Sequence, residues 1–249
     1  MGTVLLLMIV LVVSVFMEIP CYAARFLPKK ARKTLVDTVA RASLARFVAA
    51  AKAYMGMKLI YERGVPRLPP RFIVVANHQS LLDIPILMDF FRGSRTLLFV
   101  AKRELGTGIP LISSVLRLQG HALVPRSRGA ASAMKALGRM ARKADVNGYC
   151  PAIFPEGTRS RDGRLGVFHT AGLKRLLEAA PVPILVVAMA GGMGLSTLRH
   201  VVSSTEPKRY RVKTLAVFDP PGSRQETEDA LVKAKSLIQD QLDRWRLEA

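Results

Sequence analysis

Short runs of β-forming residues alternate with helical stretches from residue 64 to the end of the chain. The strand-like runs are Phe72–Ala76, Thr96–Val100, Ala122–Val124, Ala152–Phe154, Ile184–Met189 and Val212–Phe218. Helical spacing covers Asp83–Phe91, Ser113–Leu118, Ala130–Ala144 and Ala171–Ala179, and a last helix runs from about Gln225 to Leu247. Alternation of this kind is typical of α/β proteins. The sequence therefore predicts an α/β fold with a mixed, largely parallel sheet flanked by helices.

The start of the chain is its most apolar part. Residues Thr3 to Met17 carry no charge, but at about 1.5 Å per helical residue they cover only about 22 Å, less than the ~30 Å of a bilayer core. A helix that continues to Ala24 is long enough to span. Glu18 lies in that extension, so a shallow anchor in the membrane interface is an alternative. A cleaved signal peptide is a further alternative, which the absence of Lys or Arg before the run disfavours.

Basic residues follow the apolar run at once, namely Arg25, Lys29, Lys30, Arg32 and Lys33. By the positive-inside rule, these cations keep the downstream chain in the cytoplasm. We therefore expect a protein of the inner, cytoplasmic membrane whose main domain lies on the cytoplasmic face.

A second helix is predicted from about Ala31 to Gly56, with an apolar stripe at helical spacing. The stripe consists of Val36, Ala40, Leu44, Phe47, Ala51 and Met55, and Arg41, Arg46 and Lys52 lie off it. This pattern fits a helix lying on an anionic membrane, and it equally fits an ordinary helix packed on a core. We divide the chain into an N-terminal membrane anchor and amphipathic helix (1–57) and a catalytic domain (58–249).

The net charge of the chain indicates an anionic partner. Thirty-eight Lys and Arg against 18 Asp and Glu give +20, which points to nucleic acid, anionic lipid or a phosphorylated substrate. Aromatic residues make up only 6%, and no zinc-ligand or helix-turn-helix spacing occurs, which argues against nucleic acid. Cys21 and Cys150 lie in apolar sequence and indicate no disulfide framework. His121, His169 and His200 have no partners at metal-ligand spacing, so we expect no metal.

The segment Phe72–Ile84 carries the first candidate site. An apolar strand runs into a polar loop and then into a helix that bears Asp83, and loops after strands are where α/β proteins place their sites. His78 can act as a general base, and Asp83 can orient its ring and support its positive charge. The alternative is structural: Ser80 and Asp83 form a capping box, or Asp83 is itself an N-cap before Pro85.

The segment Cys150–Ser160 carries the second candidate site. Pro155 ends a strand, Gly157 permits unusual dihedral angles, and the guanidinium of Arg159 suits a phosphate. Glu156 can bind a substrate hydroxyl or hold Arg159. The alternative is a solvent-exposed turn.

Two further cations follow strand-like runs. Arg126 comes after Ala122–Val124 and can bind a phosphate, and Lys102 follows Thr96–Val100. For both, an ordinary solvated surface charge is the alternative.

Together these segments resemble the lysophosphatidic acid acyltransferases, also called 1-acylglycerol-3-phosphate O-acyltransferases. The family motif NHxSxxD matches Asn77, His78, Ser80 and Asp83, and the motif FPEGTRS matches residues 154–160 without a change. The phosphate-contacting Arg of the family falls on Arg126. The resemblance covers roughly residues 63–190.

Three departures from the family pattern put the acceptor in doubt. Pro125 stands where the family usually has Asp before its Arg. His169 follows Phe168 where a Phe-Lys-x-Gly run is usual, and Val186 replaces the second Pro of a Val-Pro-Ile-x-Pro block.

The resemblance implies a glycerolipid acyltransferase-like fold and an enzyme of phospholipid biosynthesis. Such an enzyme moves a fatty acyl group from acyl-CoA or acyl carrier protein to the sn-2 hydroxyl of 1-acylglycerol-3-phosphate at a membrane, giving phosphatidic acid. It needs no cofactor besides its thioester co-substrate. The catalytic residues implied are His78 and Asp83. The substrate-binding residues implied are Asn77, Lys102, Arg126, Glu156, Gly157, Thr158 and Arg159.

Other functions stay open at this point. Within the family, the acceptor can be another lysophospholipid or a lyso-amino-lipid. Outside it, a His–Asp pair can activate water in a thioesterase-type hydrolase, and the charge alone would suit a non-catalytic protein that binds anionic membranes.

Overall fold

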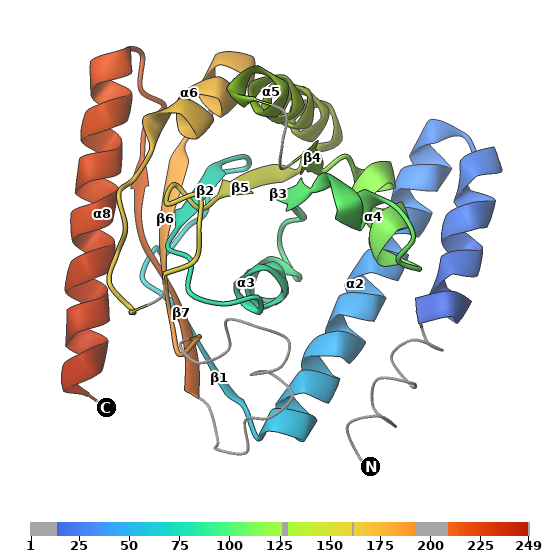
Figure 1. Cartoon of the computed structure of the whole chain (residues 1–249), viewed down its shortest axis with the longest axis horizontal. Helices are drawn as coiled ribbons and strands as arrows, with labels where there is room; N and C mark the ends of the chain where they lie inside the picture. Colours follow the sequence, from blue (N-terminus) through green and yellow to red (C-terminus); the bar gives the residue numbers. More distant parts are fainter. Residues whose placement is uncertain (1–13, 126–128, 161, 193–208, 249) are drawn as a thin grey trace.

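A mixed β-sheet forms the centre of the protein (Figure 1). The computed structural model describes residues 14–125, 129–160, 162–192 and 209–248. Within them, the sheet has seven strands in the order β1-β7-β6-β2-β5-β3-β4. Strands β2 to β6 are parallel, β7 is antiparallel to β6, and β1 is parallel to β7. The strands are β1 (Lys58–Arg63), β2 (Ile73–Ala76), β3 (Leu97–Lys102), β4 (Ala122–Val124), β5 (Cys150–Ile153), β6 (Ile184–Ala190) and β7 (Arg209–Phe218). The predicted fold class is confirmed.

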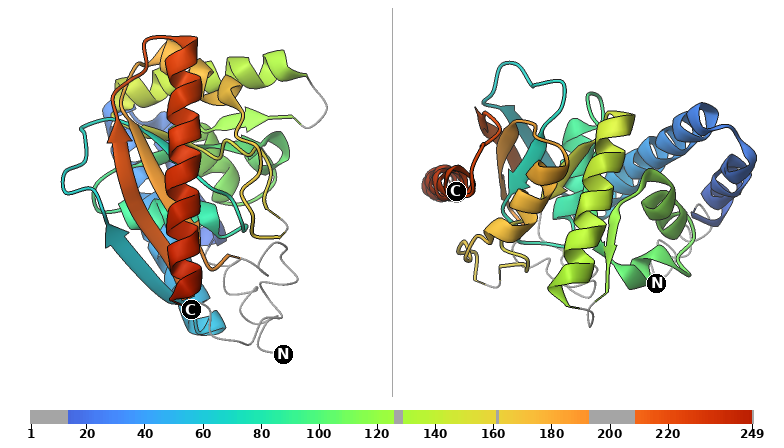
Figure 2. Two further views of the ribbon diagram at one scale, coloured as in Figure 1. Left: turned by 90° about the vertical axis from the view of Figure 1, so that its left-hand side faces the viewer. Right: turned by 90° about the horizontal axis from the view of Figure 1, so that it is seen from above.

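Helices cover both faces of this sheet (Figures 1 and 2). On one face lie α5 (Ala130–Asn147), α6 (Thr170–Ala179) and α8 (Arg224–Leu247). On the other lies α3 (Asp83–Phe91), with α2 (Lys29–Met55) beside it. The other described elements are two 3₁₀ turns, η1 (Ala24–Phe26) and η2 (Arg103–Gly106), the short helix α4 (Ile112–Gln119), and a helix over residues 14–23.

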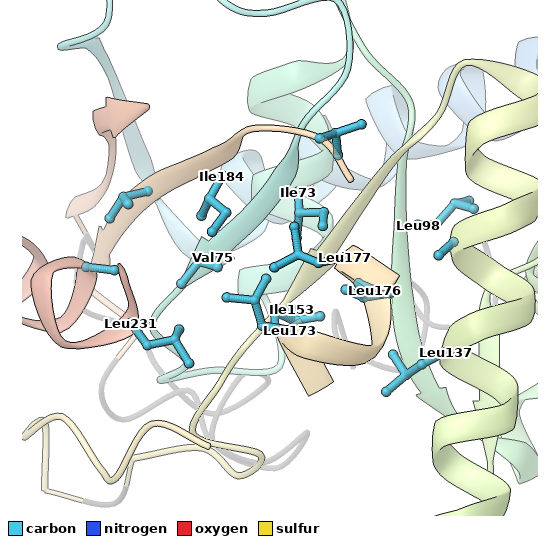
Figure 3. Packing of buried hydrophobic residues seen from close by; sticks show 14 of the residues in the cluster. Ile73, Val75, Leu98, Leu137, Ile153, Leu173, Leu176, Leu177, Ile184 and Leu231 are labelled. Carbon is cyan, nitrogen blue, oxygen red and sulfur yellow. The ribbon is translucent and has the colours of Figure 1, made fainter. Parts of the chain in front are cut away.

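The alternation of side chains along the strands produces two separate cores. Ile73 and Val75 of β2 face α5, α6 and α8, whereas Val74 and Ala76 face α3. Figure 3 shows the first core, in which leucines of α5 and α6 point toward the isoleucines and valines of the central strands. Strands that are apolar on both faces are expected for a parallel sheet covered by helices.

The structure differs from the predicted elements mainly at β1 and β7. The strand β1 was not predicted, because its sequence KLIYER carries charges at three of six positions. The strand β7 begins at Arg209, before the predicted start at Val212. Both are polar on one face, and they pair with each other at the edge of the sheet, where the burial that gives a strand its apolar signature is incomplete.

Helix α2 is packed on the protein along part of its length. Val36, Val39 and Val48 are buried, and the Asp37 carboxylate accepts hydrogen bonds from the Gln119 amide (2.9 Å) and the Tyr149 hydroxyl (2.8 Å). The interpretation as a core-packed helix therefore holds for this face. The division of the chain at residue 57 stays a prediction.

A short helix over residues 14–23 lies beside α2 and α4 (Figure 1). Its Glu18 points toward the protein, because the carboxylate accepts hydrogen bonds from the Leu111 amide (2.6 Å) and the Ser114 hydroxyl. Cys21 is buried on the same side, and burial together with Glu18 raises its pKa to about 11. The predicted apolar helix from Thr3 lies largely outside the described residues. Among the helices that the structure does describe, none has the length and apolar character to cross a membrane.

A buried histidine links α4 to the sheet. His121 Nδ1 accepts the backbone N–H of Phe99 in β3 (3.1 Å), so its other ring nitrogen carries the proton and donates to the Gln119 side chain (3.2 Å). Burial, together with the nearby Lys143 ammonium, lowers the pKa of His121 from 6.5 to about 4. This histidine is a neutral structural group at physiological pH.

Acid should therefore destabilise the fold through His121. The unfolded chain takes up this proton below about pH 6.5, whereas the folded protein takes it up only near pH 4. The free energy of unfolding should fall by about 1.4 kcal/mol for each pH unit between these values, as measured by urea unfolding. The variant His121→Asn keeps an acceptor for the Phe99 N–H and does not titrate, so its stability should fall less steeply. Equal slopes would contradict the assignment.

Candidate active site

The loop after β2 is fixed to the neighbouring strand by Asn77. The Asn77 amide donates to the carbonyl of Met189 in β6 (2.9 Å) and accepts the N–H of the same residue (2.8 Å). The side chain thus continues the pairing of β2 with β6 by one step beyond Ala76. Asn77 is completely buried, and its hydrogen bonds to Met189 set the direction in which the loop leaves β2. Its contact with substrate stays a prediction.

Asp83 gathers the loop around its carboxylate. One oxygen, Oδ2, accepts from His78 Nδ1 (2.6 Å) and from the backbone N–H groups of Gln79 (2.6 Å) and Ser80 (2.9 Å). The N-cap of α3 is Leu82, without a side-chain capping bond, so neither Ser80 nor Asp83 is the N-cap that the structural alternative predicted. The Asp83 carboxylate instead binds the loop before the helix and His78 at once.

The other oxygen of Asp83 is held by Tyr210, which sequence reasoning missed. Tyr210 is completely buried on β7, and its hydroxyl donates to Asp83 Oδ1. Gly192 lies against this pair, since a Cβ there would come within 3.0 Å of the Tyr210 hydroxyl and 3.3 Å of Asp83 Oδ1. A buried tyrosine needs a partner for its hydroxyl, and that requirement is the only signal in the sequence that pointed to such a contact.

His78 is left with one nitrogen available for chemistry. Nδ1 faces the buried carboxylate, which can only accept a hydrogen bond, so the neutral ring carries its hydrogen on Nδ1 and presents Nε2 as an acceptor. The ring is stacked on Phe154 (centroids 4.1 Å apart, planes inclined by 10°), and the side chain is 17% exposed. A carboxylate behind and an aromatic plane alongside fix the direction of Nε2, which is the arrangement of a general base.

Glu156 joins the second motif to the first. Its carboxylate accepts the backbone N–H of His78 (2.8 Å) and that of Gly166 (2.9 Å). The Ser160 N–H donates to the His78 carbonyl (2.8 Å) in addition. Both oxygens of Glu156 thus connect loops, and its predicted contact with a substrate hydroxyl or with Arg159 stays a prediction. The tight turn at Gly157, whose φ is +68°, bends the chain between these contacts.

The remaining predicted residues lie at the same edge of the sheet or outside the described part. Lys102 is exposed at the end of β3, Thr158 is exposed, and Arg159 is half-buried in the loop after β5. Arg126 falls outside the described residues. The structure therefore brings His78, Asp83, Asn77 and Glu156 together, and the substrate contacts of the others stay predictions.

Comparison with known proteins identifies the family of the chain. A family model described as Acyltransferase matches residues 60–190, just over half of the chain, so the chain belongs to the Acyltransferase family. The resemblance to the lysophosphatidic acid acyltransferases is confirmed by curated relatives and by a solved structure.

Three of these relatives show the extent of the likeness. A 1-acyl-sn-glycerol-3-phosphate acyltransferase of Helicobacter pylori is 37% identical over 148 residues, which are 59% of this chain and 57% of that protein. A probable 1-acyl-sn-glycerol-3-phosphate acyltransferase of Mycoplasma genitalium is 32% identical over 146 residues, 56% of this chain and 51% of that protein. The crystal structure of PlsC, the 1-acyl-sn-glycerophosphate (LPA) acyltransferase of Thermotoga maritima, has a TM-score of 0.70 at 26% identity. It covers 96% of this chain and 93% of that one. The chain spans about half the length of the curated relatives it matches.

Proposed function

We propose that this protein is a lysophosphatidic acid acyltransferase, which transfers a fatty acyl group from acyl-CoA or acyl carrier protein to the sn-2 hydroxyl of 1-acylglycerol-3-phosphate. The observation that carries the proposal is the buried Asp83 carboxylate behind His78, joined through Glu156 to the FPEGTRS loop. The names of the relatives support the choice of acceptor.

The proposed mechanism uses one base and no covalent enzyme intermediate. His78 Nε2 takes the proton of the acceptor hydroxyl as its oxygen attacks the carbonyl carbon of the thioester. Asp83 stabilises the imidazolium that forms. When the tetrahedral intermediate collapses, the C–S bond breaks and the imidazolium returns its proton to the departing thiolate. Holding the acceptor hydroxyl in line with the thioester supplies much of the remaining acceleration, and Arg159 and Arg126 are proposed to hold the acceptor phosphate. This sequence of steps needs no cofactor.

An exposed apolar surface supports a location at the membrane. Along the helix over residues 14–23 and the turn after it, the exposed side chains are Val15 (49%), Phe16 (63%), Ile19 (63%), Tyr22 (56%) and Phe26 (79%). The cluster Arg25 to Lys33 lies directly after this apolar face. Apolar side chains beside cations are what binding to an anionic lipid surface requires. We propose that this surface holds the protein on the cytoplasmic face of the inner membrane, where acceptor and product both reside.

An acceptor panel tests the proposed function. The purified enzyme in detergent receives labelled acyl-CoA or acyl carrier protein together with lysophosphatidic acid, another lysophospholipid, a lyso-amino-lipid, or no acceptor. We expect phosphatidic acid as the main product. Free fatty acid formed equally with and without acceptor would indicate a thioesterase. A faster reaction with another lysolipid would show that the acceptor is wrong while the acyl-transfer chemistry is right.

A further inference from the structure

A cavity opens at the same edge of the sheet as His78. It has a volume of about 360 Å³ and lies between β1, β7 and the last turns of α8, and it reaches the loop after β2 at Gln79. Its size is within the range of small-molecule sites. None of the predicted substrate-binding residues that the structure describes lines it, so the residues that line it have no assigned role.

The alternation along β7 explains why this cavity is cationic. Tyr210 faces α3 and Asp83, so its neighbours Arg209 and Arg211 face the opposite side of the sheet, toward α8. Three guanidinium groups line the cavity against two carboxylates. Arg211 lies over the Trp245 ring at 5.3 Å and pairs with Glu248 (2.6 Å).

Arg209 differs from Arg211 because it forms no ion pair with any residue that the structure describes. The other lining carboxylate, Asp162, accepts from the Arg164 N–H (3.1 Å) and the Ser160 hydroxyl (3.3 Å). The positive charge of Arg209 is therefore available to an anionic ligand. A guanidinium group suits a phosphate in particular, because its donors match the phosphate oxygens in geometry.

Gln79 supplies a second and independent indication of a ligand. Its side chain is 5% exposed, it lines the cavity, and its Oε1 has no hydrogen-bond partner among the residues that the structure describes. A buried acceptor without a donor costs stability, and such groups are rare in folded proteins. The Gln79 backbone N–H is held by Asp83 (2.6 Å), so the residue is fixed directly beside the catalytic histidine. A ligand that reaches this position from the His78 side and carries an N–H or O–H group would satisfy Gln79.

We infer that this cavity binds the phosphopantetheine arm of the acyl donor, an inference that rests on the proposed function. The arm ends in the thioester that must lie at His78. Behind the sulfur it carries amide N–H groups suited to Gln79 Oε1, and at its far end a phosphate suited to Arg209. The lysophosphatidic acid acceptor lacks such N–H groups, and its free hydroxyl is engaged at His78. Acyl-CoA and acyl carrier protein share this arm, so a single subsite serves both donors.

Binding measurements test the subsite without turnover. We would titrate the full-length protein in detergent with coenzyme A, phosphopantetheine, pantetheine and glycerol 3-phosphate, and follow the heat of binding. We expect Arg209→Ala to weaken coenzyme A and phosphopantetheine about tenfold or more, as expected for loss of a charge-assisted contact, and to leave pantetheine and glycerol 3-phosphate unchanged. The variant Gln79→Leu should weaken pantetheine as well, because it removes the acceptor for the amide groups.

Arg224→Ala is the matched control. Arg224 is exposed at the start of α8 and pairs with Glu228, about 30 Å along the helix from Trp245, so this variant should bind all four probes as the wild type does. In the acyl-transfer assay, Arg209→Ala should raise the KM for acyl-CoA about tenfold and leave the KM for the acceptor unchanged. An increase in the acceptor KM alone, or no change in either KM, would overturn the inference. If the wild type binds phosphopantetheine through Arg209 but transfers no acyl group to any acceptor, the proposed function fails and the subsite stands.

Discussion

Replacement of His78 by alanine should lower kcat for phosphatidic acid formation by about 10²–10⁴, the usual contribution of a positioned general base. The acceptor hydroxyl is a weak nucleophile until its proton is removed, and His78, whose side chain is 17% exposed and bound by Asp83, is the group that we propose removes it. The initial rate is measured with labelled acyl-CoA and lysophosphatidic acid at saturating concentrations of both.

Two controls separate loss of the base from loss of structure. The His78 ring packs on Phe154, so the thermal unfolding temperature of His78→Ala must be compared with that of the wild type. Added imidazole should restore part of the activity by replacing the missing base. An unchanged kcat in a folded variant would remove His78 as the base and with it the proposed mechanism.

The local contacts of the site could be predicted from the sequence because the residues that make them are close together in the chain. Helix α3 begins at Asp83 as predicted, since an acidic residue followed by Pro85 is a strong start signal for a helix. His78 and Asp83 are so close in the sequence that one loop is enough to bring their side chains into contact. The central strands were equally readable, because strands buried on both faces are continuous apolar runs.

Contacts between segments that are far apart in the chain could not be predicted from the sequence. Tyr210 lies 127 positions after Asp83, and the two meet because β7 runs antiparallel to β6 and brings its first residues to the C-terminal edge of the parallel strands. The predicted strand began at Val212 and left out Arg209 and Tyr210. Charged and polar groups at these positions interrupt the apolar run that indicates a strand. Glu18 shows the same limit: the bond of its carboxylate to the start of α4 joins segments far apart in the chain and had no signal in the sequence, and the shallow membrane anchor that its charge suggested stays a prediction.

Replacement of Asp83 by asparagine should lower kcat while leaving the loop in place, by no more than the roughly 10²–10⁴ expected for His78→Ala, because Asp83 acts only through His78. Asparagine keeps the hydrogen bonds if its oxygen stays at the Oδ2 position, where three N–H groups meet it, and its amino group faces Tyr210. The Tyr210 hydroxyl can turn to accept from that group. What the variant loses is the negative charge opposite the imidazolium that forms in the transition state.

Tyr210→Phe is the matched comparison for this charge effect. It removes one of the four hydrogen bonds to Asp83 and keeps both the carboxylate and the three bonds on the His78 side. We therefore expect a decrease in kcat of at most about ten- to a hundredfold, since a single hydrogen bond to a charged group contributes about 1.5–3 kcal/mol. If Tyr210→Phe reduces kcat as severely as Asp83→Asn, the position of the carboxylate matters more than its charge. If Asp83→Asn retains wild-type kcat, His78 needs no charged partner, and the buried carboxylate serves the loop alone.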